Sequence, residues 1–229
     1  MQPRSNSGVW IVVAAYNEAR TIADVVREIG RTGYALVVVD DGSADATAEL
    51  AAAAGADVVR HPFNLGQGAA LQTGIEFALA QGARFVVTFD ADGQHRTSDI
   101  AALLDALTRN DADFALGSRV LGATVNLPPR RRWLLRAATW FTRMTTGLAV
   151  TDAHNGLRAM TRRGAGAIRL HQNRMAHASE ILHQIAASGL IYVEAPVTVE
   201  YSAYSLAKGQ RTSDALTILV DLFARRLRR

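Results

Sequence analysis

Short apolar runs alternate with longer stretches of helical periodicity through the first half of the chain. The apolar runs are Val9–Ala15, Leu36–Val39, Asp57–Arg60, Arg84–Phe89 and Asp113–Gly117. Helical patterns lie between them, over Glu18–Arg31, Asp45–Ala54, Gly68–Gln81 and Thr97–Arg109. Continuous apolar strands that alternate with helices are typical of a parallel sheet covered on both faces. The pattern therefore predicts an α/β fold with a mostly parallel sheet.

The second half of the chain is less regular. Its periodicity predicts helices over Arg130–Leu148 and Ala176–Ser188, and strands over Asn155–Thr161 and Leu190–Tyr201. Beyond a polar loop, residues 212–229 predict an amphipathic C-terminal helix, because apolar residues recur there at helical spacing: Leu216, Leu219, Val220, Phe223 and Leu227. No repeat or linker divides the rest, so we expect one domain over residues 1–211 followed by this helix.

Composition limits the class of protein. With 49% hydrophobic and 20% charged residues, the chain of 229 residues is typical of a globular protein. It has no cysteine, which excludes thiolate catalysis and cysteine-ligated zinc. A net charge of +4 would suit nucleic acid, an anionic membrane surface or a phosphorylated substrate. The sequence carries no recognised nucleic-acid motif, so we expect no nucleic-acid partner.

The chain contains no apolar stretch that approaches the roughly 20 residues of a membrane-spanning helix, and residues 1–8 lack the core of a signal peptide. We therefore expect a cytoplasmic protein. Two segments would nevertheless suit a membrane surface: the arginine-rich final helix, and Arg130–Leu148, where Trp133 and Trp140 lie among arginines. They predict peripheral binding to anionic lipid on the inner face of the cytoplasmic membrane, or to a membrane protein. The alternative is that both helices pack against their own domain.

Polar clusters follow three of the predicted strands, at Ala14–Glu18, Asp40–Ser43 and Asp90–His95. Ligands of parallel sheets bind at the carboxyl ends of strands, so the clusters predict a single site. Asp90 and Asp92 would repel each other unless a cation lay between them. We expect Mg²⁺ or Mn²⁺, because hard divalent cations prefer oxygen ligands and bridge to substrate phosphates. A solvated turn is the alternative.

Other polar residues are candidates for contacts to a nucleotide. Asp40 and Asp41 could accept hydrogen bonds from a ribose hydroxyl or a base N–H, although Ser43 and its neighbours would also suit a helix N-cap. The segment Phe63–Ala69, which includes Gly68, precedes a helix and could approach a phosphate, or could simply form a tight turn.

Two arginines are candidates for phosphate binding. Arg119 follows a predicted strand, and Arg131 lies within the run Arg130–Arg132. A guanidinium group offers a planar fork of donors that suits phosphate. The alternative is the solvated surface position that most arginines occupy.

Six segments occur in an order that resembles glycosyltransferase family 2, with its GT-A fold: VVAAYNEARTI, VVVDDGSADAT, NLGQGAALQTGI, VTFDADGQH, GSRV and TDAHNGLRAM. They run from about Val9 to Arg158, roughly two-thirds of the chain. The nearest subgroup resembles the dolichyl-phosphate mannose synthases and bacterial polyprenyl-phosphate glycosyltransferases. The chain departs from this pattern with Ala14 where many relatives have proline and with Asn155-Gly156 where Ser-Gly is frequent. We also expect no transmembrane tail of the kind that many such enzymes carry.

The resemblance implies an inverting transfer from a UDP- or GDP-sugar to a polyprenyl or dolichyl phosphate, with a nucleotide-sugar half at about residues 9–118 and an acceptor half at 119–211. With the inferences above, the expected donor site comprises Ala15, Tyr16, Glu18, Asp40, Asp41, Gly68, Asp90 and Ala91. The expected metal site comprises Asp90, Asp92 and Gln94, and the expected acceptor-phosphate site Arg119 and Arg131. Asp92, Arg119 and Asp152 are the expected catalytic residues.

The acceptor remains open between two chemistries. A phosphate monoester is largely ionised at neutral pH and needs no strong base. A glycan or small-molecule hydroxyl would need one, and Asp152, which the resemblance places near the acceptor, is the candidate. A nucleotidyltransferase and a non-catalytic sugar-nucleotide-binding module are further alternatives; retention of both Asp90 and Asp92 argues against the second.

Overall fold

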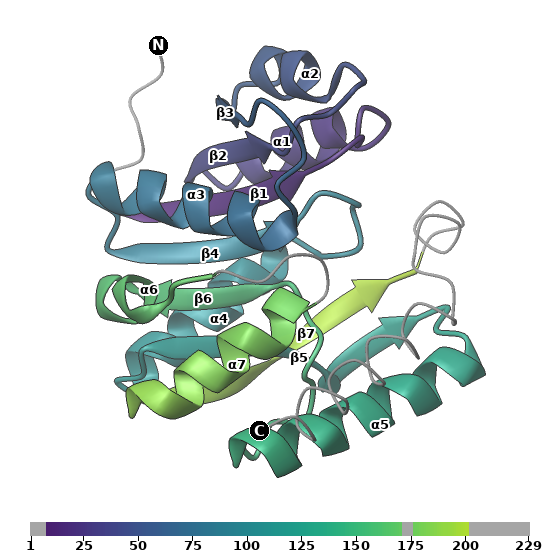
Figure 1. Cartoon of the computed structure of the whole chain (residues 1–229), viewed down its shortest axis with the longest axis vertical. Coiled ribbons are helices and arrows are strands. Elements are labelled where there is room, and N and C mark those ends of the chain that lie inside the picture. The colour runs from purple at the N-terminus through teal and green to yellow at the C-terminus, as the bar shows by residue number, and fades with distance from the viewer. Residues whose placement is uncertain (1–7, 171–175, 202–229) are drawn as a thin grey trace.

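The computed structural model describes residues 8–170 and 176–201, which form a seven-stranded sheet in the order β3-β2-β1-β4-β6-β5-β7 (Figure 1). The strands are β1 (Val9–Ala15), β2 (Ala35–Asp40), β3 (Asp57–Arg60), β4 (Phe85–Asp90), β5 (Phe114–Val125), β6 (Arg158–Thr161) and β7 (Tyr192–Glu200). β6 runs antiparallel to both its neighbours, while the other pairs are parallel. The predicted mostly parallel α/β sheet is confirmed.

Helices cover both faces of this sheet. One face carries α1 (Ile22–Gly30), α2 (Thr47–Ala53) and α4 (Ser98–Arg109). The other carries α3 (Gln67–Ala80), α6 (Arg162–Ala167) and α7 (Ala176–Ser188). The remaining helix, α5 (Pro129–Thr146), follows β5 and packs beside α7 (Figure 1).

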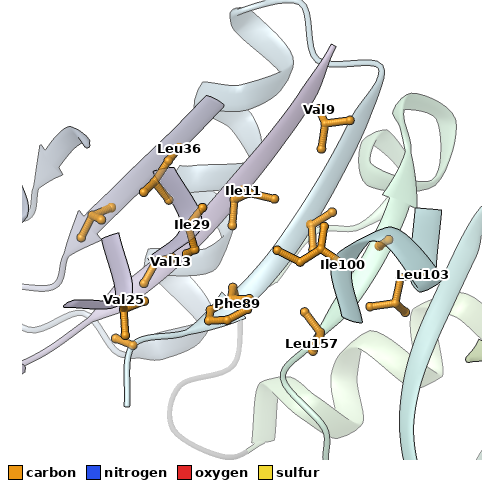
Figure 2. Close-up of a cluster of buried hydrophobic side chains, with 14 of the residues drawn as sticks. Val9, Ile11, Val13, Val25, Ile29, Leu36, Phe89, Ile100, Leu103 and Leu157 are labelled. Atoms are coloured by element: carbon orange, nitrogen blue, oxygen red, sulfur yellow. The ribbon is translucent and has the colours of Figure 1, made fainter. Parts of the chain in front are cut away.

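The strands are apolar on both faces because each face is buried under helices. In β1, Ile11 and Val13 pack toward Val25 and Ile29 of α1, as Figure 2 shows. The alternate residue Val12 joins the cluster under α3. This burial is the reason that β1, β2 and β4 read as unbroken apolar runs rather than as alternating patterns. It fixes the strands whose carboxyl ends form the site.

Several elements differ from the prediction. β5 continues past Gly117 to Val125, beyond an irregularity between Ser118 and Ala123, because β7 pairs with it there. The predicted strand Asn155–Thr161 begins only at Arg158. The short helix α6 was not predicted. The helix expected over residues 212–229 lies outside the described residues.

Within the described ranges, the structure contains no helix both long and apolar enough to cross a membrane.

Candidate functional site

A cleft of about 480 Å³ opens at the carboxyl ends of β1, β2 and β4. Its wall includes the predicted residues Ala15, Tyr16, Glu18, Asp41, Asp90, Ala91, Asp92, Gln94, Arg119 and Arg131. It also includes other residues of the predicted clusters and of the Phe63–Ala69 segment, namely Ala14, Asn64, Gly66, Gln67 and His95. The remaining ones were not predicted to line it: Ala70, His154, Asn155, Gly156, Val199 and Tyr201. The three polar clusters therefore meet in one site, as predicted, and the acceptor-half arginines lie in the same cleft.

Asp41 shapes the expected nucleotide half of the cleft. Its carboxylate accepts hydrogen bonds from the backbone N–H groups of Leu65 at 2.9 Å and Gly66 at 2.8 Å. The ring of His61 lies 2.8 Å away through Nδ1 and contacts Thr73 through Nε2. Asp41 thus holds the 63–66 loop against the end of β2. The loop in turn contributes Asn64 and Gly66 to the wall of the cleft.

The structure does not place Asp40 or Gly68 in the wall of the cleft. Asp40 is fully buried, and its carboxylate pairs with Nε of Arg60 at 3.2 Å and accepts a hydrogen bond from the Ser43 N–H. Gly68 is buried within α3, behind Gly66 and the start of that helix. Asp40 therefore supports the turn after β2 in this structure.

The end of β4 and the loop after it, residues 90–95 and called the metal loop below, hold the two candidate metal ligands. Nε2 of His95 lies 2.9 Å from Oδ2 of Asp90. Gln94 donates to Asp92 twice, from its backbone N–H at 3.1 Å and from its side-chain Nε2 at 2.7 Å. Burial, and then the charge of Asp90, raise the pKa of Asp92 to about 6. These contacts fix both carboxylates at the floor of the cleft.

The chemistry of this loop fits a hard divalent cation. Asp92 is half-buried beside the like charge of Asp90, and a cation would relieve that repulsion. In the described part of the chain no group of three or more His, Cys, Asp or Glu could hold a metal. The protein therefore offers two carboxylates, and the remaining oxygens would come from a substrate diphosphate and water, an arrangement typical of Mg²⁺. Gln94 acts here as a donor to Asp92.

Arg119 makes several contacts in the expected acceptor half. Its Nε donates to Oδ2 of Asp152 at 2.6 Å, its Nη1 donates to the Tyr201 hydroxyl at 2.6 Å, and its Nη2 donates to the carbonyl of His154. Asp152 also accepts from the Arg119 backbone N–H at 3.1 Å. The guanidinium group of Arg131 lies over the Tyr201 ring, 5.0 Å from its centroid. Asp152 does not line the cleft, but it contacts Arg119, which does.

The 154–156 segment joins the acceptor half to the metal loop. A Cβ atom at Gly156 would collide with the Asp90 carboxylate, so glycine is required for this close approach. The Gly156 carbonyl accepts a hydrogen bond from Thr88 on β4 at 2.6 Å. Burial lowers the pKa of the fully covered Arg158, while the charges of Asp90 and Asp152 oppose that effect. Gly156 therefore brings this segment into direct contact with the end of β4.

The chain is similar in sequence to known proteins. Residues 10–167 match the family described as Glycosyl transferase family 2. An uncharacterized protein of Methanocaldococcus jannaschii is 34% identical, over 96% of this chain and 92% of that one. The UDP-N-acetylglucosamine–dolichyl-phosphate N-acetylglucosaminyltransferase of Methanococcus voltae is 29% identical, over 88% of this chain and 89% of that enzyme. The polyprenol monophosphomannose synthase of Mycolicibacterium smegmatis is 36% identical, over 69% and 63%.

The fold also resembles a solved structure. Glucosyl-3-phosphoglycerate synthase from Mycobacterium tuberculosis, in complex with Mg²⁺ and UDP, has a TM-score of 0.69 and 21% identity, over 91% of this chain and 73% of that one. At this identity the likeness shows the fold, and it confirms the expected GT-A-like architecture. The family match over residues 10–167 includes most of the residues that line the cleft, and the chain therefore belongs to glycosyltransferase family 2.

Proposed function

We propose that this glycosyltransferase moves a sugar from a UDP- or GDP-sugar to a polyprenyl or dolichyl phosphate, with inversion at the anomeric carbon. The observation that carries the acceptor is the charge at the second half of the cleft. Arg119 and Arg131 line it, whereas the nearby carboxylate of Asp152 is bound to Arg119. The relatives from Methanococcus voltae and Mycolicibacterium smegmatis, named for dolichyl-phosphate and polyprenol products, support this acceptor class.

The proposed reaction is a single displacement. A phosphate oxygen of the acceptor forms a bond to C1 of the sugar, and the bond from C1 to the diphosphate oxygen breaks with its electron pair on the nucleoside diphosphate. Mg²⁺ or Mn²⁺, held by Asp90 and Asp92, would neutralise charge on that leaving group. Arg119 and Arg131 would orient the acceptor phosphate, which is ionised and needs no base.

Transfer to a hydroxyl is the alternative, with Asp152 as the base. In the structure, Oδ2 of Asp152 accepts two hydrogen bonds from Arg119, and its Oδ1 accepts one from the His154 N–H at 3.3 Å. A carboxylate engaged in this way is a poor proton acceptor for a group in the cleft. Its contacts favour a role in holding Arg119, and so support the phosphate acceptor.

The test is a screen of UDP- and GDP-sugars with Mg²⁺ or Mn²⁺, with and without polyprenyl phosphate, that measures nucleoside diphosphate release. We expect release to depend on the metal and on the lipid phosphate. Arg119→Ala should lower turnover by about 100-fold or more, because a charge-assisted contact in a closed site is worth several kcal/mol. Release of pyrophosphate would indicate a nucleotidyltransferase instead. Donor binding without turnover on any acceptor would indicate a binding module.

We also propose that the protein works at an anionic membrane surface. On α5, Trp133, Trp140 and Met144 are spaced at i, i+7 and i+11, and their exposed fractions are 76%, 62% and 63%. At 3.6 residues per turn they form one stripe on the outer face of the helix. The exposed side chains of Arg132, Arg136 and Arg143 lie along one edge of this stripe. Aromatic residues beside basic ones suit the headgroup boundary of a bilayer.

A further inference from the structure

A tyrosine links the two arginines of the acceptor half. Tyr201 follows β7, is 2% exposed and lines the cleft. Its hydroxyl accepts the 2.6 Å hydrogen bond from Nη1 of Arg119. Its ring lies beneath the Arg131 guanidinium group at 5.0 Å. One buried side chain therefore contacts both residues that would bind the acceptor phosphate, and it does so through two different parts of its structure.

The two arginines differ in their charge balance. Arg119 is paired with Asp152 at 2.6 Å, so much of its charge is already compensated. Arg131 forms no ion pair with an acidic side chain among the described residues. It therefore supplies the less compensated positive charge at this end of the cleft. A long arginine side chain loses considerable rotamer entropy when it is fixed, and stacking on a rigid aromatic ring reduces the number of rotamers beforehand.

We propose that Tyr201 is a positioning residue that holds Arg119 through its hydroxyl and Arg131 through its ring, so that both guanidinium groups converge on one phosphate monoester. This inference rests on the proposed function and deepens it, because it assigns the arrangement that would select a phosphate acceptor. A single arginine neutralised by Asp152 would bind a phosphate dianion poorly. The pair that Tyr201 assembles has the excess charge which that ligand requires.

Two substitutions separate the two contacts. Tyr201→Phe removes the hydroxyl and keeps the ring, whereas Tyr201→Leu removes both. Tyr192→Phe is the matched control, because Tyr192 begins β7, the strand that Tyr201 follows, and its hydroxyl also accepts one hydrogen bond, from the Ala149 N–H at 2.8 Å, outside the cleft. Initial rates with a nucleotide-sugar and polyprenyl phosphate give KM for each substrate and kcat, and circular dichroism melting gives Tm.

We expect Tyr201→Phe to lower kcat/KM for the lipid phosphate about tenfold, with KM for the nucleotide-sugar within about twofold of wild type. Tyr201→Leu should lower kcat/KM for the lipid phosphate about a further fivefold. Arg131→Ala should then lower it little more in the Tyr201→Leu background, because the ring that holds Arg131 is already absent. Tyr192→Phe should match wild type. The inference is overturned if Tyr201→Phe keeps wild-type kinetics, or if both Tyr201 variants raise the two KM values equally as Tm falls. A wild-type protein that is active only with hydroxyl acceptors would overturn the proposed function itself.

Discussion

Asp92 illustrates at the scale of one residue how a site can oppose the stability of its fold. Burial and Asp90 raise its pKa to about 6, so the folded state binds this proton more tightly than the unfolded chain does. The resulting stabilisation is present below pH about 4 and is lost as pH rises through 6. Asp92→Asn should therefore raise the Tm of the metal-free protein at pH 7.5 and abolish transfer. Asp105→Asn, in an exposed pair with Arg109, is the control and should change neither.

The same titration predicts how metal binding responds to pH. A proton on Asp92 competes with a cation for the same oxygens, so Mn²⁺-dependent binding of a nucleotide-sugar should weaken as pH falls below about 6. Equilibrium binding measured from pH 5 to pH 8, with EDTA as the zero-metal control, tests this. Affinity that is flat across this range, or full activity in excess EDTA, would contradict a metal site at Asp92.

Gly156 is the residue at which backbone space matters most for the site. Gly156→Ala would place a methyl group where the Asp90 carboxylate now lies, and one of the two must move. Because a displacement of about 1 Å can cost about 100-fold in rate, we expect a loss of at least that size. Gly166→Ala is a suitable control, since nothing lies within 4 Å of the added methyl group there. Equal activity of both variants would show that the metal loop tolerates the shift.

Sequence alone could locate part of this site. Two carboxylates directly after an apolar strand have few structural explanations, so Asp90 and Asp92 could be identified from their spacing. Tyr201 could not, because a tyrosine at a strand end is ordinary and its partner Arg119 is 82 positions away. Asp40 was expected to hold the nucleoside; its complete burial against Arg60 depends on how β3 pairs with β2, which the pattern does not specify.

At the scale of elements, β7 is an edge strand of the sheet whose end also contacts the metal loop. The Glu200 N–H donates to the Gln94 carbonyl at 2.9 Å, and Val199 forms a bridge with His95, so the end of β7 holds the metal loop through its backbone. The exposed side-chain pair between Glu200 and Arg96 contributes little by comparison. Glu200→Pro, which removes the N–H, should weaken Mn²⁺-dependent donor binding about tenfold, whereas Glu200→Ala should stay near wild type. Calorimetric titration of both variants with Mn²⁺ and the donor tests this prediction. Equal donor affinities would show that other contacts hold the metal loop.

The sequence could predict those elements whose own residues form a long, regular apolar pattern. Strand β1 and helix α7 match their expected bounds because their apolar patterns are long and regular. The direction of β6 and the second part of β5 depend instead on which strands lie beside them. Helix α6 has six residues and begins at a Thr161 cap that accepts from the Gly164 N–H, a local signal too short to produce a helical periodicity.

At the scale of the whole molecule, the outer face of α5 and the predicted C-terminal helix should determine membrane binding. Trp133→Ser with Trp140→Ser should reduce co-sedimentation with anionic vesicles several-fold, because aromatic anchoring is lost while the arginines remain. Phe63→Ser, an exposed aromatic on another part of the surface at 64% exposure, is the control. Binding should also fall with added salt and with truncation after Arg211. If the full-length protein does not bind anionic vesicles at low salt, a soluble acceptor becomes the better proposal.

The end of β7 has one further consequence. Val199 and Glu200 contact the metal loop, and the next residue, Tyr201, contacts Arg119. Three consecutive residues thus contact both the metal loop and Arg119, so ordering one of the two proposed substrate sites should order the other. Such linkage is reciprocal in equilibrium binding. The factor by which a bound nucleotide-sugar raises the affinity for the lipid phosphate must equal the factor by which bound lipid phosphate raises the affinity for the nucleotide-sugar. The two substrates would then bind with positive cooperativity within a single polypeptide, without any second subunit.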